Sequence, residues 1–157
     1  MIGFGYDVHR LAPGESLVLG GVHIPSDFGT VAHSDGDVLL HAVCDALLGA
    51  AALGDIGEHF PDTDKEWKNV SSVKLLQAVR QMLRDRNLDV VNLDATLVLE
   101  RPKILPYKAE MRRIIAEATS LPLERVSIKA TTSETLGFVG HGEGVTAYAV
   151  CLLTPSA

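Results

Sequence analysis

The chain has little cysteine, no long apolar run and no excess of positive charge, and each shortage excludes a class of protein. Cys44 and Cys151 are its two cysteines in 157 residues, too few for a disulfide framework or a cysteine-based zinc site. We therefore expect two buried free thiols, which fit a cytosolic protein. The sequence contains no stretch of about twenty apolar residues, so it predicts no membrane span.

The formal net charge of −6 at pH 7 argues against nucleic acid or an anionic membrane as the main partner, because both need a basic surface. A small anionic substrate needs only a local site, such as a metal ion, a helix N-terminus or one lysine. The first ten residues lack the pattern of a signal peptide, and we expect a cytoplasmic location. Length and a 46% apolar fraction suit one domain over residues 1–157.

The spacing of apolar residues predicts a mixture of strands and helices. Strands are expected at residues 2–9, 88–99, 125–131 and 145–153, with a small hairpin at 17–24 and a loop at 25–36. Helices are expected at residues 37–53, 71–86 and 106–119, with a helical turn and a glycine-rich loop before the last strand. This order predicts an α+β sandwich with helices on one face of a sheet.

Three side chains of the metal-ligand type stand out near the start of the chain. Asp7 and His9 share one face of the first strand, although such a pair is equally typical of a protein surface. His41, near the start of the first helix, adds a second imidazole. Two imidazoles and one carboxylate form the ligand set of an open zinc site. Asp45, one turn later, either orients His41 from behind or is a solvated helix carboxylate.

A second polar cluster, His33-Ser34-Asp35-Gly36-Asp37, leads into the same helix. Free backbone N–H groups at a helix N-terminus suit phosphate. Because a helix cap needs only one of these residues, the pattern favours a binding site. Past the helix, Asp55-Ile56-Gly57 and Phe60-Pro61-Asp62-Thr63-Asp64 either bind a polyol or cap turns, and the sequence leaves both readings open.

Two later segments end strands with polar residues. Arg101-Pro102-Lys103-Ile104-Leu105-Pro106 is a rigid loop that either wraps a base and a phosphate or is a plain connection. Ala130-Thr131-Thr132-Ser133-Glu134 offers hydroxyls and a carboxylate, which suit phosphate and a hard cation such as magnesium. Thr131 and Glu134 also have the spacing of a capping box.

Together these segments resemble the 2-C-methyl-D-erythritol 2,4-cyclodiphosphate synthase family of isoprenoid precursor biosynthesis. The resemblance rests on Gly5-Tyr6-Asp7-Val8-His9, His33 to Asp37, His41 to Ala50, Gly54 to Gly57, Phe60 to Asp64, Arg101 to Lys103, and Lys129 to Glu134 followed by Leu136-Gly137-Phe138. These motifs span nearly the whole chain in the family's order.

The resemblance implies a fold, an assembly and a reaction. The fold would be a ferredoxin-like α+β sandwich with a mixed four-stranded sheet and a small hairpin. The assembly would be a homotrimer with active sites at subunit interfaces. In the reaction, the 2-phosphate of 4-diphosphocytidyl-2-C-methyl-D-erythritol 2-phosphate attacks the β-phosphate, CMP leaves, and a cyclic diphosphate forms. Catalysis of this kind depends on positioning and charge neutralisation.

The resemblance also assigns roles to individual residues. Asp7, His9 and His41 match zinc ligands, and Glu134 matches the ligand of a second cation, magnesium or manganese. His33, Thr132 and Glu134 match catalytic residues. The matching substrate-binding residues are Asp7, His9, His33, Ser34, Asp55, Ile56, Gly57, Phe60, Pro61, Asp62, Thr63, Asp64, Leu99, Glu100, Arg101, Pro102, Lys103, Ile104, Leu105, Thr131, Thr132, Ser133, Glu134, Phe138 and His141.

One position departs from the family pattern. His141 stands where many members carry an arginine that faces the trimer axis, a place suggested to bind anionic isoprenoid diphosphates. The charge of a histidine depends on its surroundings, so the resemblance does not extend to such a ligand here.

Two other functions share parts of the pattern. A zinc-dependent phosphate-ester hydrolase would use the same three ligands but would release inorganic phosphate or an acyclic product. A non-catalytic nucleotide-binding protein would not need His41.

Overall fold

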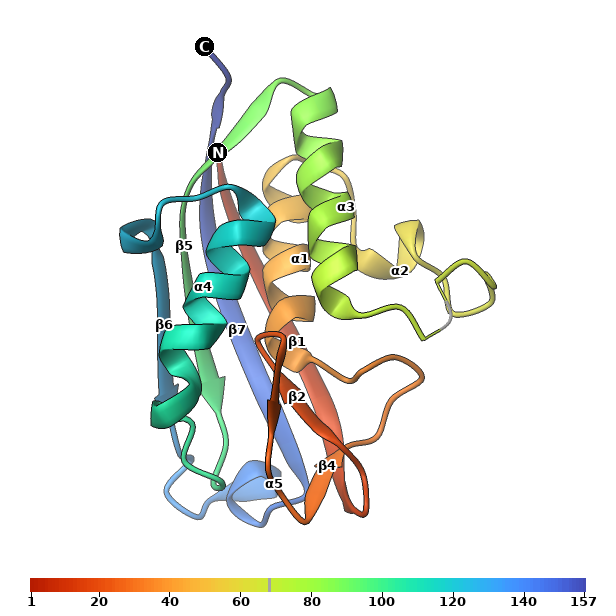
Figure 1. The fold of residues 1–157 in the computed structure, drawn as a ribbon, viewed down its shortest axis with the longest axis vertical. Helices are drawn as coiled ribbons and strands as arrows, with labels where there is room; N and C mark the ends of the chain where they lie inside the picture. Colours follow the sequence, from red (N-terminus) through yellow and green to blue (C-terminus); the bar gives the residue numbers. More distant parts are fainter. Residues whose placement is uncertain (68) are drawn as a thin grey trace.

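A five-stranded mixed sheet runs through the protein in the order β4-β1-β7-β5-β6 (Figure 1). The computed structural model describes residues 1–67 and 69–157. The strands of this sheet are β1 (Ile2–Pro13), β4 (Phe28–Thr30), β5 (Leu88–Val98), β6 (Val126–Thr131) and β7 (Gly144–Pro155). Strands β5 and β6 are parallel, and the other neighbouring pairs are antiparallel. A separate hairpin contains β2 (Leu17–Leu19) and β3 (Val22–Ile24).

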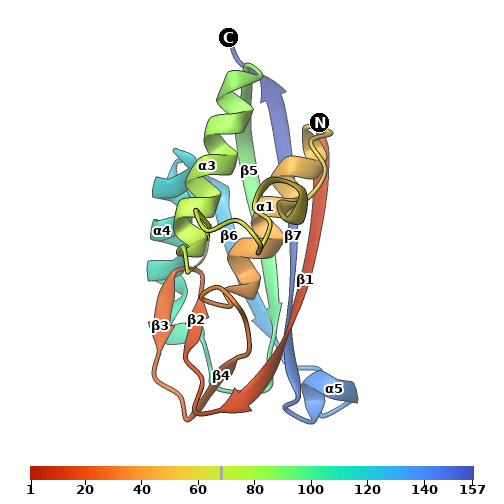
Figure 2. The same cartoon turned by 90° about the vertical axis from the view of Figure 1, so that its right-hand side faces the viewer.

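Three long helices cover one face of this sheet, as Figure 2 shows. They are α1 (Val38–Ala50), α3 (Ser72–Asp85) and α4 (Lys108–Thr119). Shorter elements are α2 (Ile56–His59), α5 (Gly137–Gly140) and the 3₁₀ turns η1 (Leu105–Tyr107) and η2 (Leu123–Arg125). Within the described residues, no helix has the length and apolar character needed to cross a membrane. The buried apolar side chains of sheet and helices form one contiguous cluster.

The predicted α+β sandwich is confirmed, but the sheet has five strands instead of four. Residues 28–30, expected in a loop, form β4 and pair with residues 11–13 at the end of β1. A three-residue strand that contains a glycine is too short to show a period of two, so the pattern could not reveal it.

The first helix also differs from its prediction at both ends. It ends at Ala50, three residues before the expected Leu53, because Ala52 already has a positive φ of 56°. Its N-cap is Asp37, whose carboxylate accepts hydrogen bonds from Leu40 N and from the hairpin amides of Gly20 and Gly21. Asp37 therefore has a structural role within the predicted polar cluster. The predicted buried free thiols, Cys44 and Cys151, are confirmed.

Strand β1 and helix α1 pack unusually closely because two glycines of β1 face the helix. A Cβ atom at Gly3 would lie 1.9 Å from Ala46 O, and one at Gly5 would lie 1.9 Å from Ala42 O. This close approach brings the side chains that follow on β1 next to the start of α1.

Gly5→Ala is expected to lower the free energy of unfolding by about 1–3 kcal/mol or more, because the added methyl group collides with backbone atoms of α1. Urea unfolding measures the change. Gly49→Ala is the matched control, because Gly49 lies in α1 with open space around its Cβ position, and alanine there should be neutral or stabilising by up to about 1 kcal/mol. Equal stability of the two variants would contradict the prediction.

The opposite face of the sheet is apolar and exposed. Side chains alternate along β1, so the residues between Gly3, Gly5 and Asp7 point away from the helices. Ile2 is 76% exposed and Phe4 is 63% exposed. The other exposed apolar or aromatic side chains of β1 and β7 are Tyr6, Val8, Tyr148, Val150 and Leu152. Exposed apolar side chains gathered on one face are typical of an interaction surface.

Candidate functional site

Asp7, His9 and His41 meet between β1 and the first turn of α1, as the sequence predicts. Asp7 Oδ2 lies 3.0 Å from His9 Nδ1 and 3.2 Å from His41 Nδ1. One ligand atom from each residue lies within 4.8 Å of the other two. His41 is buried, and Asp7 and His9 are partly buried. The close packing of β1 on α1 at Gly5 holds the strand at the distance these contacts need.

The charges of this cluster are strongly coupled. Burial alone would raise the pKa of Asp7, but the hydrogen bond to His41 and the close, positively charged imidazole of His9 lower it to about 2. Burial would lower the pKa of His41, but its hydrogen bond to Asp7 and the charges of Asp7, Asp37 and Asp35 raise it. The carboxylate therefore stays ionised at neutral pH, and a metal ion would compete with protons for the imidazole nitrogens.

The donor set fits a divalent cation. His9 Nδ1 is buried and makes no hydrogen bond of acceptable geometry, although a carboxylate oxygen lies beside it. Two imidazole nitrogens and one carboxylate oxygen are ligands that zinc accepts in an open site, and manganese, iron and cobalt accept them too. Among the described residues, these three form the one group of three or more ligand-type side chains that can hold a metal ion.

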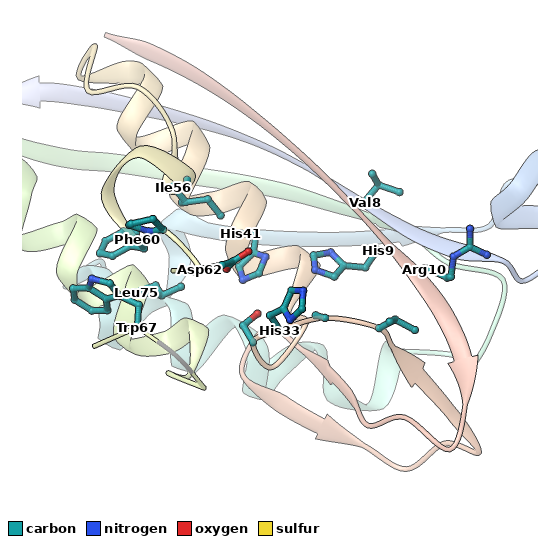
Figure 3. Close-up of a pocket in the computed structure, with 15 residues that line it drawn as sticks. Val8, His9, Arg10, His33, His41, Ile56, Phe60, Asp62, Trp67 and Leu75 are labelled. Atoms are coloured by element: carbon teal, nitrogen blue, oxygen red, sulfur yellow. The ribbon is translucent and has the colours of Figure 1, made fainter. Parts of the chain in front are cut away.

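A cavity of about 610 Å³ opens beside the cluster (Figure 3). Its lining includes His33, Ser34, Gly57 and Asp62. Phe60, Trp67 and Leu75 form an apolar wall, with Phe60 edge-on to Trp67 at 4.8 Å between ring centroids. The cavity also includes Ile56 and Pro61, and an adjoining one is lined by His33, Ser34, Asp62, Thr63 and Asp64. The loops at 33–34 and 56–64 thus meet at the metal cluster.

Asp55, predicted to bind substrate, caps α2 in the structure. Its Oδ1 accepts a hydrogen bond from Glu58 N at 3.1 Å. The sequence left open whether this loop binds a polyol or caps turns. The turn-capping interpretation is confirmed for Asp55, and polyol binding stays a prediction for Ile56 and Gly57, which line the cavity.

The second half of the predicted site forms a different cavity of about 350 Å³. The predicted residues that line it are Leu99, Glu100, Pro102, Lys103, Ile104, Leu105, Thr131 and Thr132. Glu100 Oε1 accepts hydrogen bonds from Ser133 N at 2.7 Å and Ser133 Oγ at 3.1 Å, so the loops after β5 and β6 are joined. Arg101 and His141 line a further cavity, and Phe138 lines another with His9.

Comparison with known proteins identifies the family of this chain. The model of the YgbB family matches residues 1–154. The chain belongs to the YgbB family. A relative from Salinibacter ruber named 2-C-methyl-D-erythritol 2,4-cyclodiphosphate synthase is 58% identical over 97% of each chain. The relative of the same name from Syntrophobacter fumaroxidans is 57% identical over 97% of this chain and 96% of its own.

Solved structures of family members have the same fold. A structure of 2C-methyl-D-erythritol-2,4-cyclodiphosphate synthase in a form bound to CDP has a TM-score of 0.92 and 40% identity. It covers 98% of this chain and 100% of its own. A CDP complex from Plasmodium falciparum has a TM-score of 0.87 and 31% identity, and the match covers 99% of this chain and 96% of that one.

Glu134 stands apart from the metal cluster of this YgbB-family chain. It is exposed, with a positive φ of 55°, and its backbone N–H donates to Thr132 Oγ1 at 3.2 Å. The alternative capping box between Thr131 and Glu134 does not form, because Thr131 Oγ1 donates to Thr132 O instead. A cation at Glu134 stays a prediction.

One interpretation of the sequence, that Asp45 orients the His41 ring, is wrong. Asp45 Oδ1 accepts from Ile56 N at 2.9 Å and so anchors the start of α2. His41 Nε2 instead lies 2.9 Å from the hydroxyl of Ser72. No local sequence signal predicts this contact, since Ser72 is 31 residues from His41 and has only the pattern of a helix cap.

Proposed function

We propose that this YgbB-family protein converts 4-diphosphocytidyl-2-C-methyl-D-erythritol 2-phosphate to 2-C-methyl-D-erythritol 2,4-cyclodiphosphate and CMP. The observation that carries the proposal is the Asp7, His9 and His41 cluster beside a cavity, in a chain that matches the family over residues 1–154. The CDP-bound relative with the same fold supports a substrate with a cytidine diphosphate group.

The reaction needs no protein nucleophile. An oxygen of the 2-phosphate forms a bond to the β-phosphorus, the bond from that phosphorus to the CMP oxygen breaks, and the ring closes without consuming water. Asp7, His9 and His41 would hold a divalent cation, and their donor set favours zinc. The cation would supply Lewis-acid neutralisation of phosphate charge.

Polar residues of the two cavities would bind the substrate and stabilise the transition state. His33 and Ser34 stand at the wall beside the cluster, where they can donate to phosphate oxygens, and Thr132 offers a hydroxyl on the cytidine side. Gly57 and Asp62 would contact the polyol, and Lys103 would contact the cytidine diphosphate, since they line the two cavities. Glu134 would bind a second cation, magnesium or manganese, on the diphosphate. Such fixed donors stabilise charge that develops in the transition state.

A homotrimer would join the two halves of the site. The apolar outer face of β1 and β7 is a surface that another copy can cover, with Tyr148 packed against Phe4 and Tyr6 at 6.4 and 5.2 Å between ring centroids. The metal side and the cytidine side line different cavities of one chain. An active site built from two neighbouring subunits explains both observations. The buried free thiols fit the reducing cytoplasm.

Purified protein is expected to release CMP from the diphosphocytidyl substrate in a divalent-metal-dependent manner, with a cyclic diphosphate as the second product. Chromatography measures CMP, and phosphorus NMR identifies the product. A hydrolase with the same ligands would instead yield inorganic phosphate or an acyclic diphosphate. Absence of CMP release from metal-replete protein would refute the proposal.

A further inference from the structure

Asp35 and Ser72 lie directly behind the candidate metal ligand His41, and the reaction described above uses neither. Ser72 is the first residue of α3 and is fully buried, with 0% of its surface exposed. Its hydroxyl oxygen lies 2.5 Å from Asp35 Oδ1 and 2.9 Å from His41 Nε2. Because Ser72 is not exposed to solvent, its hydroxyl forms its hydrogen bonds with this carboxylate and this imidazole.

The hydrogen bonds of Asp35 determine which group donates and which accepts along the relay Asp35–Ser72–His41. Its carboxylate accepts from Ser72 N at 2.8 Å through Oδ2 and from Asp37 N at 3.1 Å through Oδ1. An ionised carboxylate offers only acceptors, so the short contact with Ser72 requires the serine hydroxyl to be the donor. Because that hydroxyl has a single proton, its oxygen must accept from His41, and His41 must carry a hydrogen on Nε2.

This arrangement leaves His41 Nδ1 for the cation. Nδ1 is the nitrogen that faces Asp7, at 3.2 Å from Oδ2. Metal-bound histidines usually donate their other ring N–H to a fixed acceptor, which sets the tautomer and the ring orientation. We infer that Asp35 and Ser72 are positioning residues that hold the His41 ring, through the Ser72 hydroxyl, with Nδ1 aimed at the metal site.

The same contacts link two loops to the metal ligand. Asp35 belongs to the segment that presents His33 and Ser34 to the cavity, and its bond to Ser72 N ties that segment to the start of α3. A change at Asp35 or Ser72 should therefore alter metal affinity first and substrate binding second. The inference rests on the proposed metal-dependent function, but metal affinity is measured without substrate.

Ser72→Ala and Asp35→Asn are each expected to weaken zinc binding by about 10–100-fold, as is typical when an outer partner of a metal-bound histidine is removed. Competition with a chelator of known affinity measures the change. Absorption bands of the cobalt-loaded protein, which report ligand geometry, should shift in both variants. Ser72→Thr keeps the hydroxyl and should restore affinity close to that of the parent.

Ser71→Ala is the matched control. Ser71 caps the same helix by accepting from Lys74 N, but it does not contact His41. Its loss should lower thermal stability and leave zinc affinity unchanged. Zinc affinity of Ser72→Ala and Asp35→Asn equal to the parent's, or an equal loss in Ser71→Ala, would overturn the inference, as would a parent that binds no metal. A parent that binds zinc but releases no CMP would refute only the proposed reaction.

Discussion

His41→Ala is expected to lower the rate of CMP release by about 10³-fold or more and to remove the bound metal ion. The substitution takes one of three ligand atoms that lie within 4.8 Å of one another, and it leaves Asp7 with a single imidazole partner. A metal ion that neutralises phosphate charge contributes several kcal/mol to transition-state stabilisation, which corresponds to this loss. Metal content by elemental analysis and CMP release under saturating substrate measure the two effects.

Asp45→Asn is the matched control for this variant. Asp45 lies one turn further along α1, and an asparagine can still accept the hydrogen bond from Ile56 N through its side-chain oxygen. Metal content and CMP release should stay close to those of the parent. Retention of bound metal in His41→Ala, with unchanged ligand binding, would instead support a nucleotide-binding protein without catalysis.

The metal cluster could be predicted from sequence because its signals are short-range and chemical. The period of two along β1 places Asp7 and His9 on one face, and the helix pattern places His41 at the start of α1. The structure adds the reason that these elements meet, which is the contact of Gly3 and Gly5 with the backbone of α1. A glycine in a strand can mark a close approach by another backbone, but the sequence alone does not show which helix approaches.

Other features could not be predicted from the sequence because they depend on contacts between residues far apart in the chain. The relay from Ser72 to His41 joins two helices, and each residue looks ordinary in its own segment. Strand β4 exists because the end of β1 offers it a partner. The apolar side chains of β1 follow the expected alternation, but the sequence does not show that this face turns away from the helices.

A mixture of two inactive variants, His41→Ala and Lys103→Glu, is expected to recover about a quarter of the parent's CMP release after the subunits are dissociated together and reassembled. His41→Ala damages the metal side, and Lys103→Glu reverses a charge on the cytidine side. If each site combines the metal side of one subunit with the cytidine side of its neighbour, random assembly restores about one site in four. Each variant alone should stay inactive.

The double variant His41→Ala with Lys103→Glu distinguishes a shared site from one contained in a single chain. Reassembled with an equal amount of parent, it should leave about a quarter of the sites intact when two subunits contribute, but about half when each chain works alone. The separate cavities of the metal side and the cytidine side favour the first result. No recovery in the first mixture, together with half activity in the second, would place the whole site within one chain. The apolar face of β1 and β7 would then need another partner to cover it.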